Sequence, residues 1–182
     1  MIQKIRKINR GIVLLFILVI IAVVVCIVNT SRYSSRKQAA EDKATAFVAE
    51  LAALYEWPAD MPDVDADMFD RKEKLYSSYL DAGINKVKPH IFDSPLLREE
   101  LKDDAGFWFK SYLFDKVKPK QVTFVPQVTK VKLRKERATV QAIVSAKIVT
   151  SEGKIKNRSF QCEISLEYYK GDWVVVRFLR LE

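Results

Sequence analysis

With 182 residues, the chain can form one folded domain with a sizeable core, and 49% hydrophobic with 30% charged residues excludes a disordered protein. Four of the charges behind the net charge of +8 lie in the first ten residues, and the basic run 116–137 has a single aromatic residue, Phe124, so no nucleic-acid partner is expected. Cys26 and Cys162 are too few for a disulfide framework and, with a single histidine, for the usual zinc sites. We expect no cofactor and no metal.

The first predicted element is a membrane helix. Residues Gly11 to Val28 read GIVLLFILVIIAVVVCIV, without a charge or a proline. At ~1.5 Å per residue this run makes a helix of about 27 Å, close to the ~30 Å of a bilayer core. A cleaved secretory signal is the alternative, but the run is longer than a signal core and no A-x-A-like site follows it. Residues 11–29 therefore predict an uncleaved anchor in a lipid bilayer.

The charges that flank this run bear on its orientation. Residues 1–10 carry four basic residues and the segment after the run carries three, namely Lys4, Arg6, Lys7 and Arg10 against Arg32, Arg36 and Lys37. The positive-inside rule then favours a cytoplasmic N-terminus. We expect a single-pass protein whose C-terminal domain, residues 39–182, is periplasmic or extracellular.

Two helices are predicted before residue 83. The connector 30–38 has no glycine or proline, so the membrane helix can continue into a helix over 39–56. Its buried stripe recurs at steps of three and four: Ala40, Ala44, Phe47, Val48, Leu51 and Tyr55. A loop rich in proline and aspartate follows, and a helix over 67–82 is expected to end before Gly83. Its buried side is predicted to hold Phe69, Leu75, Tyr76, Tyr79 and Leu80.

Ser94-Pro95, a capping residue followed by proline, opens the next predicted helix, 95–115. One face carries Leu97, Leu101, Ala105, Trp108 and Tyr112. The second half, FWFKSYLF, is too aromatic for a narrow stripe, so its rings either complete the core or await a partner. The candidate partner contacts are the aromatic residues Trp57, Phe107, Trp108 and Phe109.

From Gln121 onward the apolar period changes to two, which predicts antiparallel strands over 121–134, 137–150, 155–169 and 172–181. Alternating apolar residues place one face of the second strand inside, from Ala138 to Ile148, and likewise Phe160 to Tyr168 on the third. Pro126 indicates an edge strand or a bulge. The predicted fold class is α+β, with about three helices packed on a curved four-stranded antiparallel sheet.

This order, and the closing YYKGDWVVVRF, in which a turn delivers a tryptophan into an apolar final strand, resemble the cone-shaped nuclear-transport-factor-two-like fold. The whole chain resembles the TraE family of inner-membrane scaffold subunits of type IV secretion and conjugation systems. PLLREELKDDAGFWFKSYLF leading into KPKQVTFVPQVTKVKLRKERATVQAIV, together with FQCEISLEYYKGDWVVVRF, carries that resemblance. It implies a bacterial inner-membrane, non-enzymatic protein that self-associates and contacts other envelope subunits.

Few residues suggest chemistry. His90 is the single histidine, and with Asp93 it could form a base and orienter in a small cavity enzyme, the alternative to an exposed loop histidine. Five acidic residues, Asp60, Asp63, Asp65, Asp67 and Asp70, lie close together but lack the calcium-loop pattern. We expect no catalytic residue. A ligand-binding sensor of the same fold remains a second alternative.

Overall fold

The computed structural model describes residues 10–59 and 73–181. They divide into two compact units, one up to Gln38 and one from Ala39 onward. Helix α1 (Arg10–Leu51) runs through the boundary as one continuous helix. The predicted continuation of the apolar helix into the first helix of the domain is therefore present in the structure.

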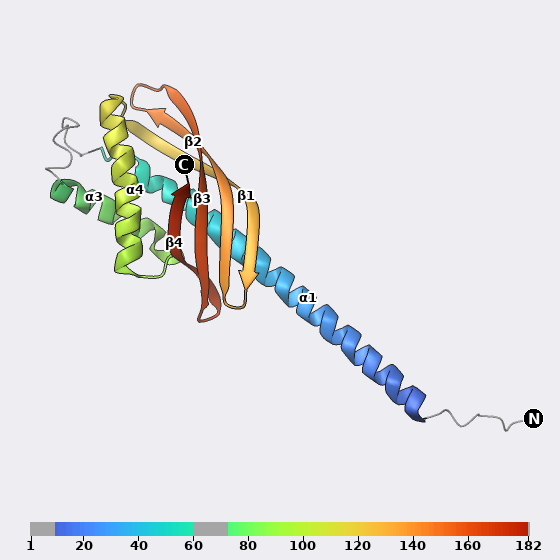
Figure 1. Ribbon diagram of the computed structural model, residues 1–182. Coiled ribbons are helices and arrows are strands. Elements are labelled where there is room, and N and C mark those ends of the chain that lie inside the picture. Colours follow the sequence, from blue (N-terminus) through green and yellow to red (C-terminus); the bar gives the residue numbers. More distant parts are fainter. Residues whose placement is uncertain (1–9, 60–72, 182) are drawn as a thin grey trace, which may run out of the picture. The chain divides into compact units, whose positions relative to one another are not determined.

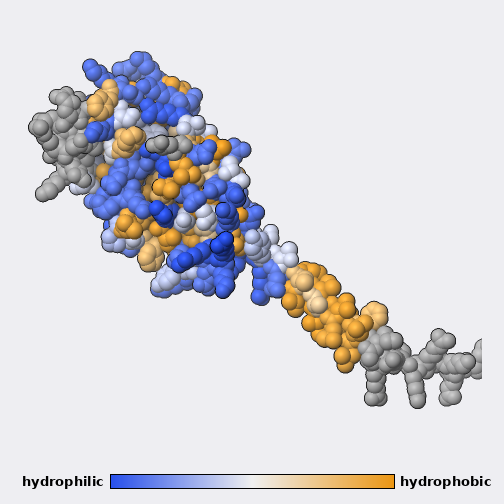
Figure 2. All heavy atoms as spheres, viewed as in Figure 1, coloured by the Kyte–Doolittle hydropathy of each residue, from blue (hydrophilic) through white to orange (hydrophobic). Residues whose placement is uncertain are grey.

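In the first unit, the large apolar side chains from Val13 to Val28 are 41–65% exposed. Figure 2 shows this part of α1 as a hydrophobic cylinder. Among the described residues, α1 is the one helix whose length and composition suffice to cross a membrane. Such a surface is unfavourable in water, because each fully exposed leucine or valine forgoes about 1.5–3 kcal/mol of burial.

In the second unit, the rest of α1 and the 3-10 helix η1 (Ala52–Tyr55) supply the first part of the core. All members of the predicted stripe are buried: Ala40, Ala44, Phe47, Val48, Leu51 and Tyr55. Three contacts, taken in order along this segment, show how it runs across the sheet. Lys43 binds Asp172, the Phe47 ring meets Phe178, and the Trp57 amide donates to the carbonyl of Pro119.

Helix α3 (Glu73–Val87) does not end before Gly83, so that predicted boundary is wrong. Gly83 lies where the helix meets Leu54: a Cβ there would be 2.6 Å from Leu54 Cδ1. The glycine therefore permits a close approach rather than a helix end. Leu80 is buried as predicted, whereas residues 67–72, Phe69 among them, and the side chains of Leu75 and Tyr76 lie outside the described part of the chain.

After a short 3-10 helix, η3 (Lys88–His90), helix α4 (Pro95–Phe114) begins with Pro95 in its first turn. Ser94 occupies the N-cap, but its side chain makes no capping hydrogen bond. Leu97, Leu101, Ala105, Trp108 and Tyr112 are all buried, as their spacing predicts, and Phe109 joins them. Helices α3 and α4 both lie on the same side of the sheet (Figure 1).

The sheet is an antiparallel meander in the order β1-β2-β3-β4. Its strands are β1 (Pro119–Arg134), β2 (Arg137–Thr150), β3 (Ile155–Tyr169) and β4 (Asp172–Leu181). The α+β class with a four-stranded antiparallel sheet is thus confirmed. β1 is an edge strand, as Pro126 indicates, and its register shifts two residues later, between Val128 and Lys130.

The buried face of the sheet follows the predicted alternation on β2, where Ala138, Val140, Ala142, Val144, Ala146 and Ile148 are all buried. On β3 the alternation holds from Cys162 to Leu166, whereas Phe160 is partly buried and Tyr168, beside the β3–β4 turn, is 37% exposed. In β4 the pairing shifts: Val175 opposes Leu166 and Arg177 opposes Ser165, which leaves Val176 as an extra residue. This bulge turns Phe178 and Arg180 toward the helices.

Candidate interaction groove between helix α4 and strands β3 and β4

A groove of about 620 Å³ lies within the second unit, between the middle of α4 and the ends of β3 and β4. Its walls combine aromatic rings with charged groups of both signs. The lining residues are Glu100, Asp103, Asp104, Phe107, Trp108 and Ser111 of α4 with Arg158, Ser159, Phe160, Phe178, Leu179 and Arg180 of the strands.

Two features of the sequence position these side chains. On α4 the polar and aromatic lining residues recur at steps of three and four, so they share one stripe beside the buried one. On β4 the extra residue Val176 reverses the alternation, so that Phe178 and Arg180 fall on the same face as the buried Val175. Arg180 therefore reaches the helix layer instead of solvent.

Asp104 is the electrostatic centre of the groove. The Tyr55 hydroxyl donates to its Oδ2, and Arg180 Nη2 lies 3.1 Å from its Oδ1. Burial raises the pKa of the Asp104 carboxyl above its ordinary value, although the Tyr55 hydrogen bond and the Arg180 charge both act to lower it. Burial, followed by the charge of Asp104, raises the pKa of Tyr55 well above its ordinary value, so this hydroxyl stays protonated and remains a donor.

Arg180 also stacks on aromatic rings. Its guanidinium carbon lies 5.2 Å from the ring centre of Phe107, 5.3 Å from Trp108 and 6.0 Å from Phe160. A planar, weakly hydrated guanidinium suits this arrangement better than an ammonium group would. Arg158 holds the far side of the groove, 5.8 Å from the Trp108 ring and 2.9 Å from Asp115.

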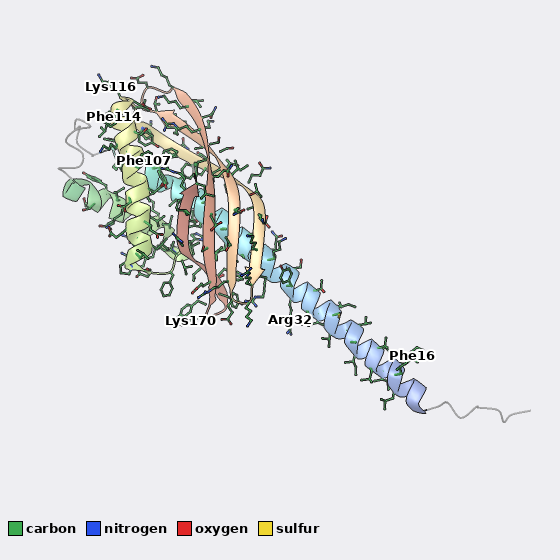
Figure 3. All side chains as sticks on the ribbon, in the orientation of Figure 1. Phe16, Arg32, Phe107, Phe114, Lys116 and Lys170 are labelled. Carbon is green, nitrogen blue, oxygen red and sulfur yellow. The ribbon has the colours of Figure 1, made fainter. Side chains whose placement is uncertain are left out.

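The predicted contact residues separate into two places. Phe107 is 65% exposed and projects from α4, where it is labelled in Figure 3. Trp108 lines the same groove but is 5% exposed. Phe109 is buried, and its ring lies 5.7 Å from that of half-buried Trp57 on the other side of the helix. Only Phe107, of these four, offers a largely exposed ring to a partner.

His90 does not pair with Asp93. Its Nε2 lies 2.9 Å from Glu50 Oε2 on α1, while Asp93 accepts from Arg98 Nε at 2.8 Å. The residues proposed as base and orienter are therefore engaged with different partners. His90 and Glu50 tie α1 to η3, and neither lines the groove.

Of the two free cysteines, Cys162 is buried in the second unit, whereas Cys26 is exposed on α1. Burial raises the pKa of the Cys162 thiol to about 12, which keeps it protonated and unreactive at neutral pH. No group of three metal-binding side chains occurs within residues 10–59 and 73–181. The aspartates from Asp60 to Asp70 lie outside those residues.

No pattern in the sequence predicts the contact of Tyr55, Asp104 and Arg180. Asp104 directly precedes buried Ala105, and Arg180 interrupts an apolar strand, so each could have been recognised as a charge beside the core. Their pairing depends on the bulge at Val176, which the alternation does not reveal.

Comparisons with known proteins give structural likeness only. No protein-family model and no curated protein matches the chain. The intermembrane space region of the chloroplast protein ARC6 is similar at 13% identity, over 80% of this chain and 95% of that one, with a TM-score of 0.41. The association domain of C. elegans CaMKII is similar at 15% identity, over 66% of this chain and 100% of that one, with a TM-score of 0.35.

A third structure is named as a calcium/calmodulin dependent protein kinase II association domain from Xanthomonas campestris. It is 16% identical over 43% of this chain, which spans about half (54%) of that protein, with a TM-score of 0.32. A further similar chain carries NTF2 in its name. The structure itself shows an α+β unit in which helices precede a four-stranded antiparallel meander. The nuclear-transport-factor-two-like fold stays a prediction from the sequence.

Proposed function

We propose that this protein is a membrane-anchored, non-enzymatic assembly subunit of a bacterial envelope complex, which acts through protein contacts of residues 39–182. The observation that carries the proposal is helix α1. One continuous helix holds both an exposed apolar run of membrane-spanning length and the first stripe of the domain core. An anchor of this kind keeps the domain at a membrane surface, where weak contacts with neighbouring subunits suffice.

The non-enzymatic part of the proposal is supported by the contacts of Asp104, the partly buried carboxylate of the groove. Both carboxylate oxygens of Asp104 are engaged, by Tyr55 and Arg180. A catalytic acid or base needs a free atom that can reach a substrate. The pairs in the groove fix the packing of α4 on the sheet instead.

The groove supports a protein partner. β4 ends opposite Gln161, so within the described residues β3 has a strand on one side only from Ile155 to Phe160. Exposed Phe107 and half-exposed Leu179 lie beside that free edge. An extended segment of a partner subunit could pair with β3 and place an apolar side chain against Phe107.

The specific form of this proposal is a subunit of a type IV secretion or conjugation complex, with its N-terminus in the cytoplasm and its domain in the periplasm. The sequence resemblance to the TraE family, carried by residues 95–114 and by the end pattern from Phe160 to Phe178, supports this form. We also propose that copies of the chain associate with one another in the assembled complex.

The test is affinity purification of the full-length protein from chemically cross-linked, detergent-solubilised membranes. We expect higher oligomers or other membrane proteins to be recovered with the wild type, and at least several-fold less with Phe107→Asp. Leu96→Asp is the matched control, since Leu96 is 71% exposed on the same helix but outside the groove. Recovery of monomer alone from membranes would contradict the assembly role.

A ligand-binding sensor is the second candidate, because the groove volume of about 620 Å³ falls within the range of small-molecule sites. In that case a bound ligand would raise the unfolding temperature of the wild type but not of Arg180→Ala. Partner recovery in the purification would then be independent of Phe107. These two outcomes separate a sensor from an assembly subunit.

A further inference from the structure

The two ends of the sheet differ in the turns that lie there. In a meander, the β1–β2 and β3–β4 turns lie at the same end, and here the Tyr168 amide donates to the Glu136 carbonyl at 2.8 Å. The β2–β3 turn lies at the opposite end, where the Ser151 amide donates to the Lys118 carbonyl beyond α4. We call the first of these the lysine-tipped end, defined by residues 134–137 and 168–172 with neighbouring Phe92.

Helix α1 enters the second unit at this lysine-tipped end. Ala40 is its first buried residue, and Lys43, one turn later, binds Asp172 at 2.8 Å in the β3–β4 turn. The helix then proceeds toward the opposite end, where Trp57 reaches Pro119. The end at which the chain enters the unit is therefore the end with the two lysine tips.

The exposed surface at this end combines aromatic rings with lysines. Phe92 is 45% and Tyr169 is 50% exposed, and their ring centres are 6.0 Å apart. Lys170 Nζ lies 5.2 Å from the Tyr169 ring centre, and Figure 3 shows Lys170 at the tip of its turn. A tyrosine ring with its polar hydroxyl, beside lysines and a fully apolar phenylalanine, suits the interface between bilayer and water.

The charge at this end is predominantly positive. Glu167 is paired with Arg137 at 3.0 Å, and Asp172 is paired with Lys43, so both carboxylates are already neutralised. Three exposed basic side chains have no carboxylate partner in the described part of the chain: Arg134, Lys135 and Lys170. In these turns, among the described residues, Glu136 is the one carboxylate outside such an ion pair.

The chain itself limits how far this end can be from a bilayer that holds the anchor. Residues 29–38 join the apolar run to the second unit. Ten residues span about 15 Å as a helix and at most about 35 Å when extended. The lysine-tipped end therefore experiences a high effective concentration of lipid headgroups, so that a weak affinity suffices for contact.

We propose that the lysine-tipped end docks on the surface of an anionic bilayer, with Phe92 and Tyr169 at the interface and Lys135 and Lys170 against lipid phosphates. This inference rests on the membrane anchoring proposed above. It adds a second membrane contact, which would fix the orientation of the domain and direct the α4 groove away from the lipid.

Photo-cross-linking of the full-length protein in vesicles tests the docking. Tyr169 is replaced by p-benzoylphenylalanine, and the protein is reconstituted in phosphatidylcholine vesicles with or without about 30% phosphatidylglycerol. Phe114 receives the same replacement as the control, since it is 64% exposed at the opposite end of the unit. We expect a lipid adduct at position 169 that is stronger with phosphatidylglycerol, and little adduct at 114.

Charge reversal provides the second arm. Lys135→Glu with Lys170→Glu should lower the adduct at 169 by at least about fivefold, because each basic residue near an anionic surface contributes about that factor. Lys154→Glu, in the β2–β3 turn, should leave it unchanged. If Tyr169 replacement impairs folding, as judged by thermal unfolding, replacement of Phe92 serves instead.

Three results would overturn the inference: equal adducts at 169 and 114, no dependence on phosphatidylglycerol, or an adduct with a second protein copy in place of lipid. Failure of the anchor is distinguishable, because the protein would then not remain with the vesicles after alkaline washing. A protein that stays in the vesicles but gives no lipid adduct would contradict the docking alone.

Discussion

The two parts of helix α1 present apolar residues in different ways. From Val13 to Val28 the apolar side chains surround the helix and are all exposed, whereas from Ala40 to Leu51 they form one stripe that is buried against the second unit. Both parts belong to the same continuous helix. The breadth of the apolar surface, rather than helicity, therefore distinguishes a segment suited to lipid from one suited to a protein core.

The largest expected effect comes from the buried part. Phe47 is completely buried and its ring lies 5.8 Å from that of Phe178, so Phe47→Ala should lower the free energy of unfolding by about 3–5 kcal/mol. Phe16→Ala, in the exposed part, should change it by less than about 0.5 kcal/mol. Denaturant titration of the detergent-solubilised protein, followed by tryptophan fluorescence, measures both. Equal losses would remove the distinction between the two parts.

For membrane insertion, we expect the larger effect from a substitution in the exposed part of α1. Leu18→Asp places a carboxylate in the middle of the apolar run, at a cost of about 3 kcal/mol for insertion. The protein should shift from the alkali-resistant membrane fraction to the soluble fraction, while the folded second unit keeps its unfolding midpoint. Leu18→Ile is the control. Unchanged fractionation of the aspartate variant would count against a membrane-spanning role of this run.

Two tyrosines, one in the second unit and one in the connector, allow the same comparison at a single hydroxyl group. Tyr55→Phe removes the hydroxyl that donates to Asp104 and should lower the free energy of unfolding by about 2 kcal/mol, since the acceptor is a partly buried carboxylate. Tyr33→Phe changes a tyrosine that is 52% exposed in the connector and should have no measurable effect. The same denaturant titration applies. A loss below about 0.5 kcal/mol for Tyr55→Phe would mean that the hydrogen bond contributes nothing net.

The smallest expected effect is a pH dependence. Burial raises the pKa of Asp104 above the ordinary value of 3.8, so the folded state binds a proton more readily than the unfolded state. The contribution of this carboxyl is fully present below about pH 3.8 and is lost as the pH rises through the raised pKa. The stability of the wild type relative to Asp104→Asn should increase as the pH falls, by at most about 1.4 kcal/mol per pH unit. A difference that is constant between pH 7 and pH 4 would contradict the raised pKa.

The elements that the sequence predicts well are those with a regular period. The stripe from Ala40 to Tyr55 and the alternation on β2 are both buried as predicted, because each repeats over several turns or residue pairs. The α4 stripe is equally regular. In each case the residue types alone determine which face is apolar.

Single-residue features could not be predicted in this way. Glycine is a residue type that often ends helices, but Gly83 lies within one. It permits the close approach of Leu54, which is 29 positions earlier in the chain. His90 pairs with Glu50 rather than with nearby Asp93. Such partners depend on how elements distant in the sequence meet, and local patterns carry no information about that.

The bulge at Val176 makes the effect of a one-residue deletion in β4 depend on where the deletion falls. Removal of Val176 would restore simple alternation between Val175 and Phe178 and leave Arg180 facing the helices, whereas removal of Leu179 would turn Arg180 toward solvent. Without Leu179, Asp104 would lose its cation while remaining partly buried. Loss of one residue near the exposed tip of the β2–β3 turn, such as Glu152, changes no side-chain face within a strand. Natural variation in chain length should therefore be tolerated at that turn and excluded from the segment between Phe178 and Arg180.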